Sequence, residues 1–590
     1  MIKWVTLLGL LVCTTLQAAN GSGNNLTTVA ERSNFERTGR YTEVEQLCAA
    51  FAERFSDRVR CFEFGTTPEG RRMLGLAVSS VGLLTSDEAK RRSHPVVFMQ
   101  GGIHAGEIDG KDAGFLALRQ MLEGKAAPGA LEKVTLVFVP VFNVDGHERF
   151  GEWNRPNQSG PKEMGWRTTA QNLNLNRDYT KADAPEMQAL LRLLNEWDPI
   201  AYVDLHATDG ADFEHDIAYL VSPTLDGDED LRRAGIALQD DLIRRMTELG
   251  SLPLDFYPSL QREDDPQSGF FVAVGPARFA QEYWAKRNRI GVLVETHSWK
   301  PYPKRVLATR HTIVTMMELS ARHGKEWMRL ARQAEERNLK LGGQEVPLVY
   351  ENTPHERMID FKGYAYSREP SAISGALVTK YDPTRPQIWR IPLKDQVQPS
   401  VSVTAPRGGY IVPAAHAAWV REKLSLHNIE FETLARPFSS EELDVYRAEK
   451  AEPTATTFEG RTMLGLEGKW QKERRDVPSG SLFVPIAQPN SPLAIALFEP
   501  GYPDSFVRWG FFNAAFEPKE YMEAYVAEEV GTQMLKEDPA VRAEFSRKLA
   551  EDPEFARSPA KRLEFFYRRH ASWDDQRNLY PVFRTDRELK

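Results

Sequence analysis

The sequence is poor in cysteine, and beyond its start it has no long hydrophobic run. Only 3 of its 590 residues are cysteine, and none form a Cys-x-x-Cys pair, which argues against a zinc site built from thiolates. After the first twenty residues no apolar stretch reaches the roughly 20 residues that a membrane-spanning helix needs. The sequence therefore predicts no stable membrane insertion.

The chain also lacks an excess of positive charge. Its 75 basic and 83 acidic residues give a net charge of −8, and no lysine- or arginine-rich block stands out. This balance is a poor electrostatic match for nucleic acid. Hydrophobic residues make up 41% and charged residues 27%, which excludes a wholly disordered or collagen-like chain. We expect a folded protein of several domain-sized units.

Residues 1–19 have the pattern of a targeting signal. A short cationic start is followed by the apolar run Trp4–Val12 and by small residues around Ala18. This pattern predicts a signal peptide over residues 1–19, cleaved near Ala18-Ala19, and a secreted or periplasmic protein. The alternative is a buried N-terminal helix. Cleavage of the signal peptide leaves two cysteines, Cys48 and Cys61. We expect them to form a disulfide; the alternative is two buried thiols.

From about Thr42 to Arg332, predicted strands alternate with predicted helices. The expected strands are Pro95–Gln100, Val134–Val141, Ile200–Leu205 and Arg289–Glu295, and the expected helices are Asp112–Leu122 and Ala184–Trp197. The alternation predicts an α/β domain over residues 35–335 with a mixed, mostly parallel sheet flanked by helices. Sites in such sheets lie at the carboxyl ends of the strands.

The remaining residues predict a C-terminal β-rich and α+β accessory region. Residues 345–438 are expected to form a small module with short strands at Ala372–Lys380, Gln387–Ile391 and Val401–Thr404 and a helix at Ala414–His427. Residues 441–590 are expected to mix strands with a helical tail that prolines divide into short helices. Glu69-Gly70-Arg71 recurs as Glu459-Gly460-Arg461 within a similar eight-residue stretch. One such match is more often chance than duplication.

Chemistry-bearing residues follow two of the predicted strands. His104 and Glu107 come directly after one, and His206 ends another 102 residues later. Imidazole nitrogen and carboxylate oxygen are zinc ligands, and a catalytic zinc site takes three protein ligands and a water. The pattern predicts one zinc ion held by His104, Glu107 and His206.

Two further features strengthen this prediction. Asn176 and Arg177 place an amide beside a guanidinium, a pair suited to gripping a carboxylate. Glu295 ends a wholly apolar strand. A carboxylate buried there would be costly unless it has a partner or a functional role. The role that fits is that of a general base toward a metal-bound water.

Taken in order, these motifs resemble the funnelin-type zinc carboxypeptidase family over about half of the chain. The matching elements are His104 with Glu107, Asn143-Val144-Asp145-Gly146, Trp166-Arg167, Asn176-Arg177, His206 and Glu295. The resemblance implies that His104, Glu107 and His206 bind zinc and that Glu295 is the general base. It further implies that Asn176 and Arg177 hold the substrate's terminal carboxylate and that Arg167 stabilises the oxyanion.

Two positions depart from the family pattern. Asn174 stands where the family usually has an aspartate that orients the first zinc histidine, which predicts a lower metal affinity. The family's tyrosine before the glutamate strand has no clear counterpart, because Tyr283 is close to Glu295 and Phe270 and Phe271 occupy the expected distance.

We therefore expect an exported zinc metallocarboxypeptidase whose partner is a peptide with a free C-terminal carboxylate. The alternatives are a murein-peptide or N-acyl-amino-acid amide hydrolase that uses the same site, and a catalytically inactive peptide-binding protein. The sequence predicts neither the side-chain preference, nor the oligomeric state, nor the role of residues 342–590.

Overall fold

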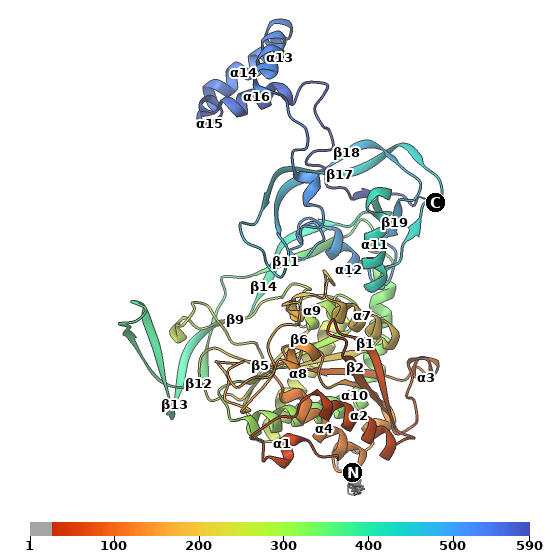
Figure 1. Cartoon of the computed structure of the whole chain (residues 1–590), viewed down its shortest axis with the longest axis vertical. Helices are drawn as coiled ribbons and strands as arrows, with labels where there is room; N and C mark the ends of the chain where they lie inside the picture. Colours follow the sequence, from red (N-terminus) through yellow and green to blue (C-terminus); the bar gives the residue numbers. More distant parts are fainter. Residues whose placement is uncertain (1–25, 590) are drawn as a thin grey trace, which may run out of the picture.

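The computed structural model describes residues 26–589 (Figure 1). The predicted signal peptide, residues 1–19, lies outside the described residues. Among the described helices, none combines the length and the apolar character that crossing a membrane requires.

An eight-stranded mixed sheet forms the centre of the N-terminal half. In spatial order it contains β1 (Val59–Thr66), β2 (Arg72–Val78), β4 (Thr135–Val139), β3 (Val96–Gly101), β5 (Ala201–Thr208), β10 (Ile290–His297), β6 (Ile217–Ser222) and β7 (Pro253–Leu254). The central strands β4, β3, β5 and β10 are parallel to their neighbours within this group, and β1, β2 and β6 pair in antiparallel fashion. The predicted fold class is confirmed.

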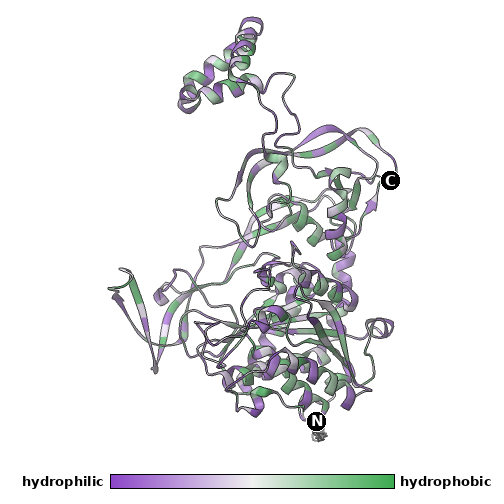
Figure 2. Cartoon of the chain, viewed as in Figure 1, coloured by the Kyte–Doolittle hydropathy of each residue, from purple (hydrophilic) through white to green (hydrophobic). Residues whose placement is uncertain are grey.

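Helices flank this sheet. They are α1 (Val29–Arg32), α2 (Tyr41–Arg54), α3 (Ser86–Arg91), α4 (Asp109–Leu122), α5 (Ala130–Lys133), α6 (Val144–Glu148), α7 (Pro185–Trp197), α8 (Glu229–Glu248), α9 (Ala280–Ala285) and α10 (Tyr302–Asn338). The long helix α10 packs against α4 and α8, whereas α7 contacts β1 and α9 contacts β10. The central strands are fully buried and largely hydrophobic, as a sheet covered on both faces requires (Figure 2).

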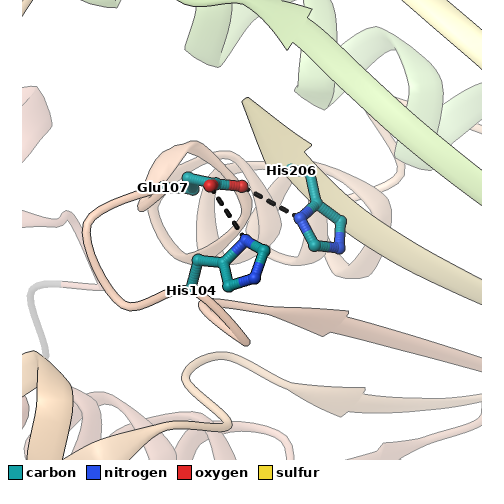
Figure 3. Close-up of side chains that lie close together, drawn as sticks. All are labelled: His104, Glu107 and His206. Carbon is teal, nitrogen blue, oxygen red and sulfur yellow. Dashed lines mark hydrogen bonds and ion pairs between the residues drawn. The ribbon is translucent and has the colours of Figure 1, made fainter. Parts of the chain in front are cut away.

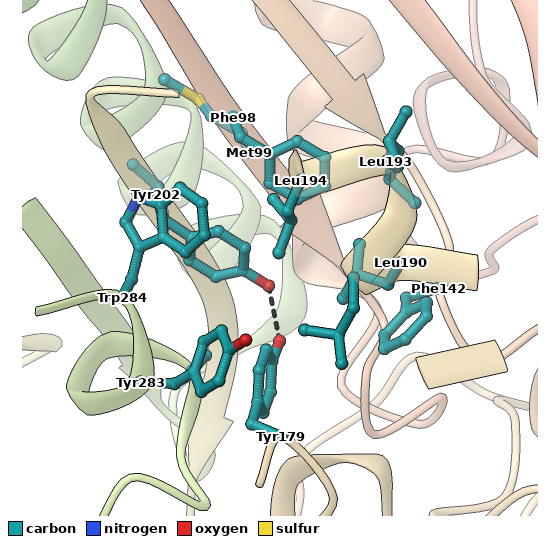
Figure 4. Close-up of a cluster of buried hydrophobic side chains, with 14 of the residues drawn as sticks. Phe98, Met99, Phe142, Tyr179, Leu190, Leu193, Leu194, Tyr202, Tyr283 and Trp284 are labelled. Carbon is teal, nitrogen blue, oxygen red and sulfur yellow. Dashed lines mark hydrogen bonds between the residues drawn. The ribbon is translucent and has the colours of Figure 1, made fainter. Parts of the chain in front are cut away.

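Aromatic side chains fill the space between the sheet and the helices (Figure 4). The hydroxyl groups of Tyr179 and Tyr202 lie 2.6 Å apart, and the Gln100 amide donates to the Tyr179 oxygen at 3.3 Å. Trp284 of α9 packs against Tyr202. The buried hydroxyl groups of Tyr179 and Tyr202 thus have hydrogen-bond partners within the core. Through Tyr179, these contacts fix the backbone that follows Arg177 against the sheet.

The predicted disulfide is present. Cys48 of α2 and Cys61 of β1 are bonded, and their Cα atoms lie 5.4 Å apart. The bond ties the first long helix to the edge strand of the sheet.

The segment after α10 contains longer strands than the sequence predicts. The expected run Gln387–Ile391 and the second half of the expected run Ala372–Lys380 belong to one strand, β13 (Leu377–Lys394), which forms a hairpin with β12 (Arg357–Pro370). Residues 372–376, predicted as strand, form the turn of this hairpin. The prediction of separate short strands is wrong here because prolines at 383 and 386 fall at an irregularity of pairing that does not end the strand. This hairpin forms one four-stranded sheet with β9 (Phe270–Phe271) and β8 (Ser259–Leu260), in the order β12-β13-β9-β8. Both β8 and β9 belong to the N-terminal half of the chain.

A six-stranded sheet organises the C-terminal region. Its spatial order is β16 (Glu432–Thr433), β19 (Leu482–Pro485), β15 (Gly409–Val412), β20 (Phe583–Thr585), β17 (Phe438–Pro453) and β18 (Leu464–Val477). Segments 345–438 and 441–590, predicted as separate units, thus share one sheet. They do so because the short apolar strands β15 and β19 supply each other's backbone partners.

The other C-terminal elements surround this sheet. They are the pair β11 (Glu345–Asn352) and β14 (Val397–Thr404), helices α11 (Ala414–Leu426) and α12 (Ser491–Phe498), and an outlying helical unit of α13 (Ala524–Glu537), α14 (Pro539–Glu551), α15 (Pro553–Arg557) and α16 (Pro559–Tyr567). The outlying unit has a small phenylalanine core of its own (Figure 1). The prolines begin its short helices, as predicted.

Candidate active site

The structure brings His104, Glu107 and His206 together at the carboxyl ends of β3 and β5 (Figure 3). His104 Nδ1 lies 2.9 Å from Glu107 Oε1, and His206 Nδ1 lies 2.9 Å from Glu107 Oε2. All three side chains are buried. Two ring nitrogens therefore converge on one carboxylate, the arrangement that the spacing of the three residues predicts.

An oxygen atom supports the outer nitrogen of each imidazole. His104 Nε2 lies 3.1 Å from Asn174 Oδ1, and His206 Nε2 lies 2.8 Å from Asp204 Oδ2. The Gln100 amide donates to the other oxygen of Asp204 at 3.0 Å. Because the outer nitrogen of His104 faces an acceptor, its Nδ1 is free to present a lone pair to a cation. Burial acts to lower the pKa of His206, but Asp204 and Glu107 outweigh it and raise that pKa well above its usual value.

The charges at this point also suit a cation. Burial lowers the pKa of His104 to about 4, so its imidazole is neutral at neutral pH. Burial acts to raise the pKa of Glu107, but His104 and Arg155 outweigh it and hold that pKa well below its usual value. Two imidazole nitrogens and one carboxylate form a donor set that zinc accepts, with a further position left for water or substrate. The residues present fit a zinc ion.

Glu295 lies on β10, next to His206 on β5. The two residues are paired in the parallel register, so neighbouring strands deliver both side chains to the same end of the sheet. Burial raises the pKa of Glu295 to about 8; His206 opposes this rise, and Glu107 and Asp204 add to it. Glu295 Oε2 has no hydrogen-bond partner within residues 26–589. The carboxyl group is therefore poised to exchange a proton near neutral pH.

Asn176 and Arg177 lie in the same cavity, in a short 3₁₀ turn that Asn174 caps with its side chain. The Arg177 guanidinium donates to the Asn176 carbonyl at 2.7 Å and lies over the Phe279 ring. It makes no ion pair with any residue that the structure describes. Burial lowers the pKa of Arg177, nearby Arg167 adds to this effect, and Glu459 opposes it. A half-buried cation that has no ion-pair partner among the described residues is a ready site for an anion.

Arg167 reaches the cavity from a loop that the Asn143–Gly146 motif supports. The Asn143 side chain donates to the Arg167 carbonyl at 3.2 Å, and Trp166 donates its backbone N–H to Gly146 at 2.7 Å. A Cβ at Gly146 would meet the Thr168 carbonyl at 2.5 Å, so only glycine fits this contact. The Arg167 guanidinium lies 3.5 Å from Glu107 and is partly exposed.

Sequence reasoning missed two cavity residues, Arg155 and Tyr257. Arg155 is buried and lies 3.0 Å from Glu107 Oε1. Its only sequence signal is its position twelve residues before Arg167. The Tyr257 hydroxyl lies 3.1 Å from Thr208 Oγ1 and faces the cavity. Tyr283, considered from the sequence, instead lies in the core, where its hydroxyl contacts His427 at 2.9 Å.

The cavity has a volume of about 360 Å³. Its lining combines polar and charged side chains, among them Glu107 and Arg177, with uncharged residues from β6, β9, β10, α9 and the segment before α9. The uncharged lining residues there are Leu220, Phe271, Val272, Ala273, Phe279, Gln281 and Leu293. The cavity thus offers both an anion site and an uncharged pocket.

The chain is similar to one protein family and to several known proteins. The family model of zinc carboxypeptidases matches residues 44–211. The inactive metallocarboxypeptidase ecm14 of Schizosaccharomyces pombe is 35% identical over 102 residues, which cover 16% of this chain and 20% of that protein. This chain thus spans one fifth of the length of that curated relative.

Solved carboxypeptidases are also similar to the chain. Carboxypeptidase A of Helicoverpa armigera matches at 16% identity with a TM-score of 0.34, covering 50% of this chain and 75% of that one. A metallo-carboxypeptidase of Burkholderia cenocepacia matches at 16% identity with a TM-score of 0.34, covering 46% and 68%.

Proposed function

We propose, from the zinc carboxypeptidase domain that residues 44–211 carry, that this protein is a zinc-dependent peptidase that releases C-terminal residues from peptides. The observation that carries the proposal is the position of Arg177. Its half-buried guanidinium has no ion-pair partner among the described residues and lines one cavity with His104, Glu107 and Glu295. Only a substrate with a negative charge next to the cleaved bond makes use of this arrangement.

In the proposed reaction Arg177 binds the terminal carboxylate of the peptide in a bidentate manner, and the Asn176 amide adds a hydrogen bond. The two residues thereby place the last peptide bond beside His104, Glu107 and His206, which would hold the zinc ion. A zinc ion there supplies Lewis-acid chemistry that polarises a carbonyl group and makes water a better nucleophile.

The chain's own groups perform the proton transfers and stabilise the developing charge. Glu295 accepts the proton of the attacking water at Oε2 and passes a proton to the nitrogen of the leaving amine. Arg167 donates hydrogen bonds to the oxygen of the scissile carbonyl as negative charge develops on it. Arg155, held between Glu107 and the Ala207 carbonyl, keeps the Glu107 carboxylate in place.

The uncharged pocket supports a preference for substrates with an uncharged, mainly apolar C-terminal side chain. Leu220, Leu293 and Val272 bring no charge to it, and the amide of Gln281 is its polar group. Burying a lysine or glutamate side chain there without a partner would be costly. The murein-peptide, N-acyl-amino-acid and binding-protein alternatives involve the same residues, and no feature of the cavity favours them. Export stays a prediction from residues 1–19.

A set of matched peptides tests the proposal. We expect cleavage of a peptide that ends in leucine or phenylalanine, weaker cleavage when it ends in lysine or glutamate, and none when its C-terminus is amidated, read by mass spectrometry. Cleavage of the amidated peptide at a comparable rate would show that the enzyme does not use Arg177 to read a terminal carboxylate, and would contradict the proposal.

A further inference from the structure

The loop that carries the proposed substrate-binding pair is held from outside by the C-terminal region. The Lys423 ammonium of α11 donates to the carbonyls of Lys181 and Ala182 at 2.6 and 2.9 Å. The Trp509 indole donates to Thr180 Oγ1 at 3.1 Å. Residues more than 230 positions later in the sequence thus fix the segment that follows Arg177.

The turn between β17 and β18 makes the contact nearest to the active site. Arg461 in this turn forms two hydrogen bonds to the Asp183 carboxylate, at 2.6 and 2.8 Å. Glu459, two residues earlier, accepts a hydrogen bond from the backbone N–H of Asn174 at 3.1 Å. The arginine anchors the turn on the N-terminal domain, and the glutamate reaches the loop beside the proposed metal ligands.

Asn174 is the link between this turn and His104. Its side-chain oxygen lies 3.1 Å from His104 Nε2 and accepts the Asn176 N–H at 3.0 Å. The position of that oxygen depends on where the Asn174 backbone is held, and among the described side chains Glu459 is the one that binds its N–H. Displacing this backbone would withdraw the acceptor from His104.

We propose that Glu459 is a positioning residue of the active site: through the Asn174 backbone it holds the acceptor that orients His104 for metal binding. The C-terminal region is then part of the working site and not a separate binding module. This inference rests on the proposed function, because it assumes that His104 binds zinc.

The repeated Glu-Gly-Arg sequence provides a matched control. Glu69-Gly70-Arg71 forms the turn between β1 and β2, and its arginine binds Asp145, as Arg461 binds Asp183. Gly70 and Gly460 both have left-handed backbone conformations, with φ of 80° and 78°. The Glu69 carboxylate, however, pairs with Arg71 at the surface and has no contact with the metal residues. The two glutamates thus precede the same Gly-Arg pair, but only Glu459 has a left-handed backbone conformation and only Glu459 contacts Asn174.

The test is the zinc affinity of the purified full-length protein, measured by competition with a chelator. Glu459 has φ of 49°, a conformation that asparagine tolerates, and the shorter side chain cannot reach Asn174. Residues that directly support metal ligands affect affinity by about 10–100-fold, and Glu459 acts one step further out. We therefore expect Glu459→Asn to weaken zinc binding by about three- to tenfold. Glu459→Gln, which keeps an acceptor oxygen, and Glu69→Asn should both bind zinc like the wild type.

Three results would overturn the inference. Equal zinc affinity in Glu459→Asn and wild type would show that the contact does not position His104. A lower Tm of the metal-free Glu459→Asn protein with unchanged zinc affinity would assign Glu459 to folding alone. Wild-type protein that binds no zinc would contradict the proposed function, and this inference with it, whereas the first two results leave the proposed function standing.

Discussion

Glu295 and His206 are register partners on the adjacent parallel strands β10 and β5. The sheet itself therefore sets their separation, and no flexible loop lies between the proposed base and a proposed metal ligand. Both side chains are buried, so their positions are further restricted by packing. Rigid strands that deliver such groups give the precision that catalysis needs.

Asn174 should govern metal affinity. Its side-chain oxygen is the acceptor for His104 Nε2, and groups in this position affect affinity by about 10–100-fold. We expect Asn174→Ala to weaken zinc binding by that factor and Asn174→Asp to strengthen it, because a carboxylate is the better acceptor. Isothermal titration with zinc measures both. Unchanged affinity in Asn174→Ala would show that His104 needs no such support.

Arg177 should govern binding of the peptide carboxylate. Arg177→Lys keeps the charge but loses the planar fork that binds two oxygens at once. We expect KM for a peptide to rise at least tenfold, with little change in zinc content. Steady-state kinetics on one peptide series provide the measurement. A KM unchanged in both Arg177→Lys and Arg177→Ala would remove Arg177 from the substrate site.

Arg167 should act mainly on the chemical step. Removing one donor to a developing oxyanion typically costs on the order of 10²–10³ in kcat. We expect Arg167→Ala to show a loss in this range with a much smaller change in KM. The buried Arg155 is the other arginine near Glu107. If Arg167→Ala keeps full kcat while Arg155→Lys loses it, Arg155 must be the residue that stabilises the oxyanion and Arg167 the one that holds Glu107.

Glu186 makes stability depend on pH. Burial raises the pKa of this α7 carboxyl from 4.5 to about 7, and neither of its oxygens has a hydrogen-bond partner in the described part of the chain. The folded state therefore favours the protonated form, so stability from this group is full below about pH 4.5 and falls as the pH rises towards 7. We expect Glu186→Gln to raise Tm relative to wild type at pH 8 and to change it little at pH 4.5. An equal Tm difference at both pH values would contradict this assignment.

Much of the N-terminal half was predictable from sequence. Apolar runs such as Arg289–Glu295 indicate buried strands, and the polar residues that end them must meet at one edge of a parallel sheet. His104, Glu107, His206 and Glu295 meet in the structure for this reason.

Residues on irregular segments were not predictable. Tyr257 lies on a segment whose path depends on the β8–β9 and β12–β13 strands around it. Arg155 lies in a loop without periodicity. The Glu459–Asn174 contact joins residues 285 positions apart, and no local pattern encodes it. The length of β13 was misjudged because proline usually interrupts strands, whereas this exposed hairpin tolerates it.

The most direct test measures zinc content and peptide cleavage together in wild type and Glu295→Gln. Glutamine occupies the same space but cannot accept the proton, so the account predicts about one zinc per chain in both proteins and release of C-terminal residues by the wild type alone. Wild-type protein without zinc, or Glu295→Gln with undiminished cleavage, would contradict it.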